Sequence, residues 1–232
     1  MEKSVIRKRI FKIKNYDNIK VLVFCDTHGE EDYNERIIHY AKKNKPALII
    51  CAGDFTTMNR RLEDYLHEFN SLNIPFLIIH GNHESQDRIK AVLEETYLKN
   101  IVFMHKNLIK FKGFCITGYG GGGFSQRYKE LDEYSTILSD DLDTLNCKFK
   151  IFISHAPVFN TKLDLLNNMH RGSESLRETL EKIHFNLCIC GHFHENEKII
   201  DKVDDTTIIN PGREGAIVTV SSDNQIKKID FL

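Results

Sequence analysis

Short apolar runs alternate with amphipathic stretches through the first hundred residues. Three short and almost wholly apolar runs predict buried strands: Lys20–Cys25, Ala47–Cys51 and Pro75–Ile79. Each run is followed by a stretch whose apolar residues recur at helical spacing: Asn34–Lys43, Arg60–Leu72 and Asp87–Leu98. Three repeats of a strand and then a helix favour parallel β-α-β units, and therefore an α/β fold.

The pattern changes after residue 100, where short strands with tight connections predict that a second sheet begins: Ile101–Met104, Leu108–Phe111 and Phe114–Thr117. Two helices are expected later, over Leu131–Leu145 and over Ser173–Lys182, where Ser173 suits a helix start. The remaining apolar runs predict further strands: Ile151–Ser154, Leu187–Cys190, Glu197–Val203, Thr206–Ile209, Ala216–Val220 and Ile226–Phe231. No linker or repeat interrupts the pattern, so we expect one domain over residues 20–232, with residues 1–19 as a basic N-terminal extension that is part of the same domain.

The composition of the 232 residues is that of an ordinary globular protein, with 41% hydrophobic and 28% charged residues. The formal net charge is −1, so no global basic field attracts a nucleic acid, and such a partner is not expected. The sequence has no apolar run long enough for a membrane span, and its N-terminus lacks the apolar stretch of a signal peptide. We therefore expect a cytoplasmic protein without a membrane partner, whose six cysteines stay reduced.

One run of charge stands out, in the N-terminal extension: Lys3, Arg7, Lys8, Arg9, Lys12 and Lys14. The simplest interpretation is a solvated terminus. Binding of a nucleic acid or an acidic partner by this stretch is left open, because it rests on charge alone.

Five polar motifs each follow directly after a predicted strand: Asp26-Thr27-His28-Gly29, Gly53-Asp54, Gly81-Asn82-His83-Glu84, His155 and Gly191-His192-Phe193-His194. The carboxyl ends of strands form the ligand crevice of open α/β sheets, so the five motifs are expected to converge. In an extended chain, residues i and i+2 point to one side. Asp26 with His28, and His192 with His194, would then each serve a common site.

The polar side chains in these motifs are oxygen and imidazole ligands. Two aspartates, an asparagine and four histidines, with a fifth histidine beside the asparagine, suit two divalent transition ions better than one. Each motif alone also fits a structural role, because an Asp-x-His pair arises by chance and a single histidine is often a core residue. Their joint occurrence, each at a strand end, favours a metal site over a structural explanation.

In this order the motifs resemble those of the calcineurin-like metallophosphoesterase superfamily, and they span Asp26 to His194. That superfamily has Asp-x-His, Gly-Asp, Gly-Asn-His-Glu/Asp, a single His and Gly-His-x-His, which read here DTHG, GD, GNHE, SHAP and GHFH. Further matches resemble its small bacterial and archaeal phosphoesterase branch: Thr161-Lys162-x-Asp164, His170-Arg171-Gly172-Ser173 and Asn210-Pro211-Gly212.

The resemblance implies a fold and a set of metal ligands. The fold would be a four-layer αββα sandwich of two mixed β-sheets flanked by helices, with the site at the edges of the sheets. By motif position, the ligands of a first metal would be Asp26, His28 and His194. The ligands of a second metal would be Asn82, His155 and His192, and Asp54 would bridge both. The ions would be divalent transition metals, with Mn the first choice and Fe, Zn, Ni or Co the alternatives.

The implied activity is the hydrolysis of a phosphate ester. Two cations would clamp the attacking and leaving oxygens, and a metal-bridging hydroxide would attack the phosphorus. His83 would stay off the metals near the leaving group, where it stabilises the phosphoryl charge or protonates the leaving oxygen. The expected substrate is a small or nucleotide-like phosphodiester. A phosphomonoesterase on the same site and a non-catalytic scaffold of the same fold are the alternatives, and the oligomeric state is left open.

Outside the five motifs, the candidates for substrate binding are His170 and Arg171, which precede a predicted helix and could contact a phosphate. A solvated surface pair is equally compatible with the sequence, and Arg213 ranks below both. The glycine loop Gly120–Gly123 lacks the Lys-Ser/Thr of a P-loop, so a nucleoside triphosphate site is not expected. Cys188-x-Cys190 has no second cysteine pair to complete a zinc site and is interpreted as packing.

Overall fold

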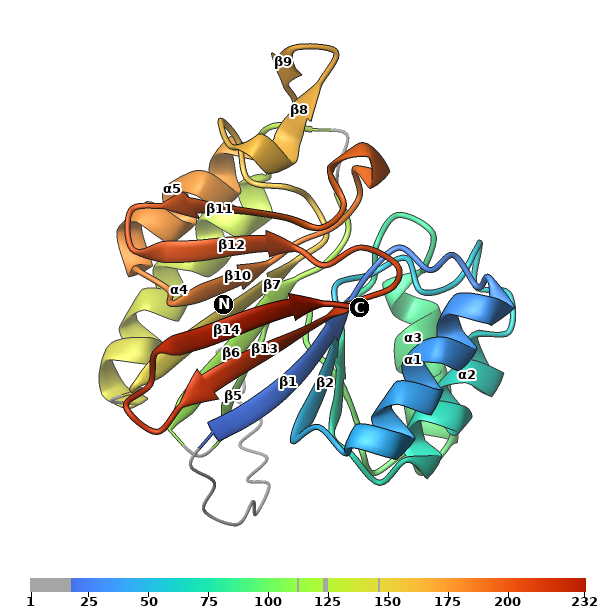
Figure 1. Ribbon diagram of the computed structural model, residues 1–232. Helices are drawn as coiled ribbons and strands as arrows, with labels where there is room; N and C mark the ends of the chain where they lie inside the picture. Colours follow the sequence, from blue (N-terminus) through green and yellow to red (C-terminus); the bar gives the residue numbers. More distant parts are fainter. Residues whose placement is uncertain (1–17, 112, 123–124, 146) are drawn as a thin grey trace.

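Two six-stranded β-sheets face each other in the computed structural model (Figure 1). The structure describes residues 18–111, 113–122, 125–145 and 147–232. The basic stretch of the N-terminal extension, and the end of the glycine loop at residues 123–124, lie outside the described residues.

The first sheet has the strand order β14-β13-β1-β2-β3-β4. Its four parallel strands are β1 (Asn18–Phe24), β2 (Leu48–Cys51), β3 (Phe76–Ile78) and β4 (Ile101–Phe103). Two antiparallel strands from the end of the chain complete it beside β1, namely β13 (Ala216–Ser221) and β14 (Ile226–Phe231). The mixed sheet therefore joins the two ends of the described chain.

The second sheet has the order β11-β12-β10-β7-β6-β5. Its parallel strands are β6 (Phe114–Tyr119), β7 (Phe149–Ser154), β10 (Leu187–Ile189) and β12 (Thr206–Asn210). The antiparallel edge strands are β5 (Asn107–Phe111) and β11 (Ile199–Val203). Short 3₁₀ turns and a small hairpin lie on the connections: η1 (Lys162–Asp164), β8 (Leu165–Leu166), β9 (Met169–His170) and η2 (His194–Asn196).

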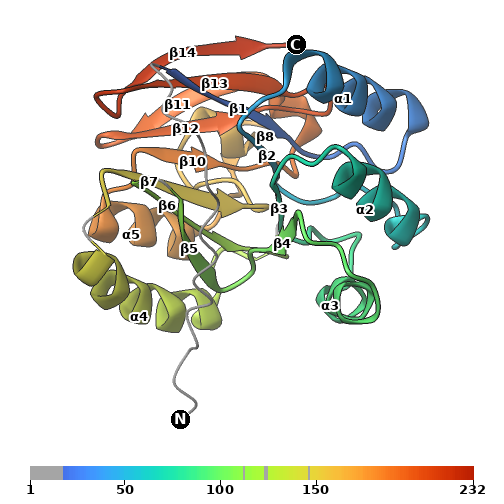
Figure 2. The ribbon, with the colours of Figure 1, turned by 90° about the horizontal axis from the view of Figure 1, so that it is seen from below.

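Helices cover the outer face of each sheet (Figures 1 and 2). The first sheet is covered by α1 (Glu31–Asn44), α2 (Leu62–Ser71) and α3 (Gln86–Glu95). The second is covered by α4 (Lys129–Leu145) and α5 (Glu174–Ile183). The Ser173 side chain caps α5 by accepting a hydrogen bond from the backbone N–H of Leu176, as the sequence predicts. The four-layer αββα sandwich of two mixed sheets is therefore confirmed.

The alternation of side chains along β1 explains why residues 21–24 are all apolar. Val21 and Val23 point between the two sheets, whereas Leu22 and Phe24 pack under the helices. All four side chains are fully buried. A strand covered on both faces gains from apolar residues at every position, so it appears in the sequence as a continuous apolar run.

The expected position of the second sheet is wrong at one strand. The apolar run Ile101–Met104 is predicted to belong to that sheet, but β4 pairs in parallel with β3 of the first sheet, with Phe76 opposite Ile101. The crossover through α3 is another β-α-β unit, so β4 continues the first sheet. The second sheet begins at β5, which forms an antiparallel hairpin with β6.

Within the described part of the chain, none of the helices is both long enough and apolar enough to cross a bilayer. The cytoplasmic location stays a prediction.

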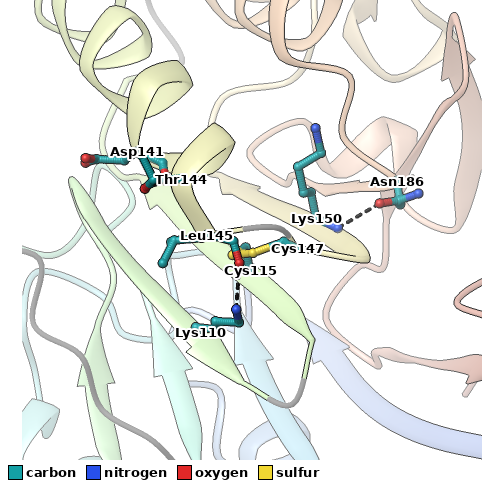
Figure 3. The surroundings of a disulfide bond; sticks show 8 residues. All are labelled: Lys110, Cys115, Asp141, Thr144, Leu145, Cys147, Lys150 and Asn186. Atoms are coloured by element: carbon teal, nitrogen blue, oxygen red, sulfur yellow. Dashed lines mark hydrogen bonds between the residues drawn. A yellow bond between two sulfur atoms is a disulfide. The ribbon is translucent and has the colours of Figure 1, made fainter.

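Cys115 in β6 and Cys147 after α4 are joined by a disulfide bond (Figure 3). Their Cα atoms are 5.7 Å apart, which is within the range that a disulfide spans. The expectation that all six cysteines are reduced is therefore wrong for this pair, because the fold brings together two residues 32 positions apart in the sequence. The free cysteines of the structure are buried among apolar side chains: Cys25, Cys51, Cys188 and Cys190.

We expect the unfolded, unreduced protein to show four free thiols rather than six, measured with a thiol reagent in denaturant. The disulfide closes a loop of 32 residues. By reducing the entropy of the unfolded chain, such a link stabilises the folded protein by about 3–4 kcal/mol. Cys147→Ser should therefore lower the melting temperature by roughly 10 °C. Reductant should lower the melting temperature of the wild type to that of the variant and leave the variant unchanged. Six thiols in the unreduced protein would contradict the bond.

Candidate metal centre

The five polar motifs meet at one edge of the sandwich, where parallel strands of both sheets end. The link between the sheets is direct. Nδ1 of His155, after β7, lies 3.0 Å from the carbonyl oxygen of Ala52, after β2. The backbone N–H of His192, after β10, donates to Oδ2 of Asp26, after β1, at 2.9 Å. Side chains from both sheets therefore share one site.

Four residues in these motifs have a left-handed backbone, with φ of 56° at Asp26, 51° at His28, 50° at Asp54 and 73° at His192. The expected extended geometry of Asp26-x-His28 and His192-x-His194 is therefore wrong. The chain turns sharply as soon as each strand ends, and this turn aims the side chains into the site. A non-glycine residue with a left-handed backbone stores about 1–3 kcal/mol of strain. It keeps this conformation only where surrounding contacts hold the backbone in place.

Asp26, His28 and His194 form a first group whose ligand atoms all lie within 4.8 Å of one another. Nε2 of His194 is 3.0 Å from Nε2 of His28 and 3.8 Å from Oδ1 of Asp26. Oδ1 of Asp26 is buried and has no hydrogen-bond partner among the described residues. A buried carboxylate oxygen without a donor is unfavourable unless a cation compensates its charge.

Asp54, His155 and His192 form a second group with the same spacing of ligand atoms. Oδ2 of Asp54 is 3.3 Å from Nε2 of His155. Asn82, in the loop after β3, places Oδ1 at 3.0 Å from both Nε2 of His155 and Nδ1 of His192. The amide oxygen of Asn82 therefore joins this group.

Asp54 lies between the two groups. Its Oδ2 is also 3.9 Å from Nε2 of His28, and it forms a third group with His28 and His83. Its Oδ1 accepts a hydrogen bond of 2.8 Å from the backbone N–H of His83. The ring of His83 packs edge-on against that of His28, and its Nδ1 is buried with no partner in the described structure. The first two groups bring together residues that the sequence resemblance names as ligands, whereas the third includes His83, which the resemblance keeps off the metals. The metal-binding roles stay a prediction.

Asp54 and His155 form a buried ion pair. Burial opposes ionisation of Asp54, but the hydrogen bond and charge of His155 lower its pKa to about 2. Burial alone would lower the pKa of His155, but the hydrogen bond and charge of Asp54 raise it to about 9. Asp54 is therefore ionised at neutral pH, which is the state that a metal ligand needs.

Glu84 organises the backbone of this site, a role that the sequence analysis did not assign. Its buried carboxylate accepts hydrogen bonds of 2.9 Å from the backbone N–H groups of Asp54 and Gly81. It also accepts bonds of 2.8 Å from the backbone N–H and the hydroxyl of Thr56. Burial and the charge of Asp54 raise its pKa to about 7, against the effect of these donors. The signal in the sequence is that Glu84 ends a motif whose other members include a proposed metal ligand.

Two motif glycines are needed because backbone lies directly against the aspartates. A Cβ on Gly81 would be 2.0 Å from Oδ1 of Asp54, and a Cβ on Gly191 would be 2.4 Å from Oδ2 of Asp26. Any other residue at either position would displace a carboxylate from the site.

The site fits divalent transition ions. It offers carboxylate, amide and imidazole groups, which are the oxygen and nitrogen ligands that Mn, Fe, Zn, Ni and Co accept. The unpaired Oδ1 of Asp26 is an arrangement that a cation would stabilise, and Nε2 of His28 and Nε2 of His194 belong to groups that contain or adjoin it. Which metal binds is not determined by these ligands.

The three peripheral candidates lie in different surroundings. Arg213, on the loop after β12, reaches the first group, with Nη2 at 3.2 Å from Nδ1 of His194. Nδ1 of His170 is 2.6 Å from Oδ1 of the buried Asp164, at the base of the β8–β9 hairpin. The guanidinium of Arg171 lies 3.4 Å from the sulfur of Met169 in the same hairpin. Arg213, which sequence reasoning ranked lowest, is the one whose described contacts reach the metal-ligand groups.

The first part of the glycine loop is tied to the strand end beside the site. The N–H of Gly121 donates to the carbonyl oxygen of His80 at 2.8 Å, and the N–H of Gly120 donates to Nδ1 of His105 at 2.9 Å. This segment is a structured connection as far as residue 122.

Comparison with known proteins places these features in a family. The profile of the calcineurin-like phosphoesterase family matches residues 19–196. An uncharacterized protein of Methanocaldococcus jannaschii is 26% identical over 92% of this chain and 97% of its own length. A probable glycerophosphodiester phosphodiesterase of Arcobacter nitrofigilis is 27% identical over 85% of this chain and 80% of its own.

The fold is also that of a solved structure from Thermus thermophilus. The two superpose with a TM-score of 0.67 over 86% of this chain and 93% of the other, at 14% sequence identity. At this identity the likeness concerns the fold, including the paired sheets whose ends carry the site.

Proposed function

The chain belongs to the calcineurin-like phosphoesterase family, and from this premise we propose a binuclear metal-dependent phosphodiesterase that acts on a small or nucleotide-like substrate. Membership of the family makes the protein a phosphoric ester hydrolase and implies dependence on divalent metal ions. The observation that carries the proposal is the position of Asp54 between two groups of ligand side chains, with His83 beside them.

The proposed ligands follow these groups. The first ion would be held by Asp26, His28 and His194, and the second by Asn82, His155 and His192. Asp54 would contact both, because its Oδ2 lies toward His155 and toward His28. His155 is already oriented for this role: the carbonyl of Ala52 accepts from its Nδ1–H, so Nε2 faces Asp54 and Asn82.

When bound, two divalent ions would neutralise phosphoryl charge and lower the pKa of water at the site. The protein supplies the geometry for this chemistry. Glu84 fixes the backbone of Asp54 and Gly81, and Asp54 fixes the backbone of His83. His83 then offers an imidazole near the leaving group, where it either stabilises charge or donates a proton to the leaving oxygen.

A diester substrate is favoured over a monoester by the similarity to the probable glycerophosphodiester phosphodiesterase of Arcobacter nitrofigilis. The bound cations would supply most of the local positive charge, so attraction of a phosphate ester does not require a basic chain. Substrate contacts by His170 and Arg171 stay a prediction, as does the preference for Mn.

The test compares bis(4-nitrophenyl) phosphate with 4-nitrophenyl phosphate after metal removal by a chelator and reconstitution with Mn. We expect no hydrolysis before reconstitution, and a kcat/KM at least about tenfold higher for the diester afterwards, equivalent to about 1.4 kcal/mol. A preference for the monoester would select the phosphomonoesterase alternative. Absence of hydrolysis with Mn, Fe, Co, Ni and Zn would select the scaffold alternative.

A further inference from the structure

Arg213 presents a hydrogen-bond donor to a proposed metal ligand at a position where an acceptor is expected. A histidine that binds a metal through one ring nitrogen normally donates the proton on its other nitrogen to a carbonyl or a carboxylate. His155 follows this rule, because its Nδ1 faces the carbonyl oxygen of Ala52. His194 does not, because its Nδ1 lies 3.2 Å from Nη2 of Arg213.

The contact determines where His194 carries its proton. A guanidinium can only donate, so Nδ1 of His194 must accept, and the neutral ring then carries its hydrogen on Nε2. That nitrogen lies 3.0 Å from Nε2 of His28, which can accept from it. Arg213 thus donates to His194 and His194 donates to His28, which places a proton on the nitrogen of His194 that faces the metal site.

Arg213 is held in this position by contacts with other side chains. Its Nε donates to Oε1 of Glu197 at 2.9 Å, and its Nη1 is 3.7 Å from Oε1 of Glu30. The guanidinium carbon lies 5.5 Å from the centre of the Tyr33 ring. Side-chain exposure is 24% for Arg213 and 19% for Glu197, so this pair is largely shielded from solvent, whereas Glu30 is exposed. The guanidinium is therefore a fixed part of the site's border.

We propose that Arg213 is a positioning residue that opposes metal binding at His194 and must release this histidine before the first ion is bound. His194 can offer Nε2 to a cation only after its proton has moved to Nδ1, where it would face the guanidinium donor. The positive charge of Arg213 also repels a cation bound at His194. This inference rests on the proposed role of His194 as a metal ligand.

The decisive variant is Arg213→Gln, whose amide oxygen can accept the proton on Nδ1. Titration of the metal-free protein with Mn by calorimetry should show about tenfold tighter binding of one ion, on the scale by which groups that orient a ligand change metal affinity. Arg213→Lys keeps the charge and should give a smaller gain. A merely structural role for Arg213 would instead weaken Mn binding when it is lost.

Arg36→Gln is the matched control. Arg36 also lies over the Tyr33 ring and pairs with Glu214, but its side chain is on the exposed surface of α1. We expect this variant to bind Mn as the wild type does. If the wild type binds none of Mn, Fe, Co, Ni and Zn, the proposed function fails, and if it binds one of the others but not Mn, the titrations are run with that metal. If the wild type binds Mn and Arg213→Gln binds it equally or more weakly, the inference alone is overturned.

A second measurement needs no variant. Nitrogen-15 spectra of the metal-free wild type should show His194 with its proton on Nε2, and addition of diamagnetic zinc should move it to Nδ1. A metal-free His194 that already carries its proton on Nδ1 would overturn the proposal.

Discussion

Asp54→Asn should remove nearly all metal-dependent hydrolysis, and with it the binding of both ions. The carboxylate lies between the two groups of ligands, 3.3 Å from Nε2 of His155 and 3.9 Å from Nε2 of His28. Asparagine keeps the size of the side chain and an oxygen that can accept from the N–H of His83. It removes the negative charge and one of the two oxygens, so it cannot contact two cations in the same way.

We expect kcat/KM for bis(4-nitrophenyl) phosphate to fall at least about 10³-fold, a loss of about 4 kcal/mol of transition-state stabilisation. The metal content after desalting should fall from about two ions per chain to less than one. Asp64→Asn is the matched control, since Asp64 is an exposed residue of α2 whose carboxylate pairs with Arg61.

Circular dichroism should show that Asp54→Asn remains folded, so that the loss is one of metal binding. His155 loses its ion-pair partner in this variant, and its pKa should fall from about 9, because burial is then opposed only by the charge of Asp26 and the hydrogen bond to Ala52. If Asp54→Asn still bound two ions tightly, the assignment of Asp54 as the bridging ligand would be wrong.

His83→Ala should have the second largest effect, but on turnover and not on metal content. The His83 ring packs edge-on against His28, and its backbone N–H is held by Asp54. A positioned imidazole that transfers a proton contributes about 10²- to 10⁴-fold to a rate. We expect kcat to fall within that range while both ions are retained in metal analysis.

The leaving group distinguishes the two roles considered for His83. If the imidazole protonates the leaving oxygen, His83→Ala should slow hydrolysis of an alkyl diester far more than that of bis(4-nitrophenyl) phosphate, whose leaving group needs no proton. If the imidazole stabilises phosphoryl charge, both substrates should slow equally. His67→Ala, on the exposed side of α2, is the control and should leave both rates unchanged. Full turnover by His83→Ala would contradict either role.

The fold was predictable from the sequence wherever local pattern and burial agree. The buried parts of β1, β2 and β3 are apolar at every position, because each strand is covered on both faces, by helices and by the other sheet. The sheet to which β4 belongs was harder to predict. Its apolar run has the same character in either sheet, and only its pairing with β3 shows which sheet it joins.

The candidate site was predictable in its residue types and less so in its geometry. Carboxylates and imidazoles directly after apolar strands indicate a metal site, whatever the local conformation. The left-handed backbone at Asp26, His28 and Asp54 could not be read from residues that prefer other conformations. It is held by contacts with distant segments, such as the hydrogen bond from the N–H of His28 to the carbonyl of Asp54.

By itself, the sequence determined the α/β class, the family resemblance and which side chains are available to bind a metal. Periodic burial and motif order are properties of the chain, so they can be read along it. The tertiary structure alone decided that Cys115 bonds to Cys147, that Glu84 holds the backbone of Asp54, and that Arg213 faces His194. Each of these contacts joins residues on different strands or loops. Their distance in space depends on the packing of two sheets, which no local stretch of sequence specifies.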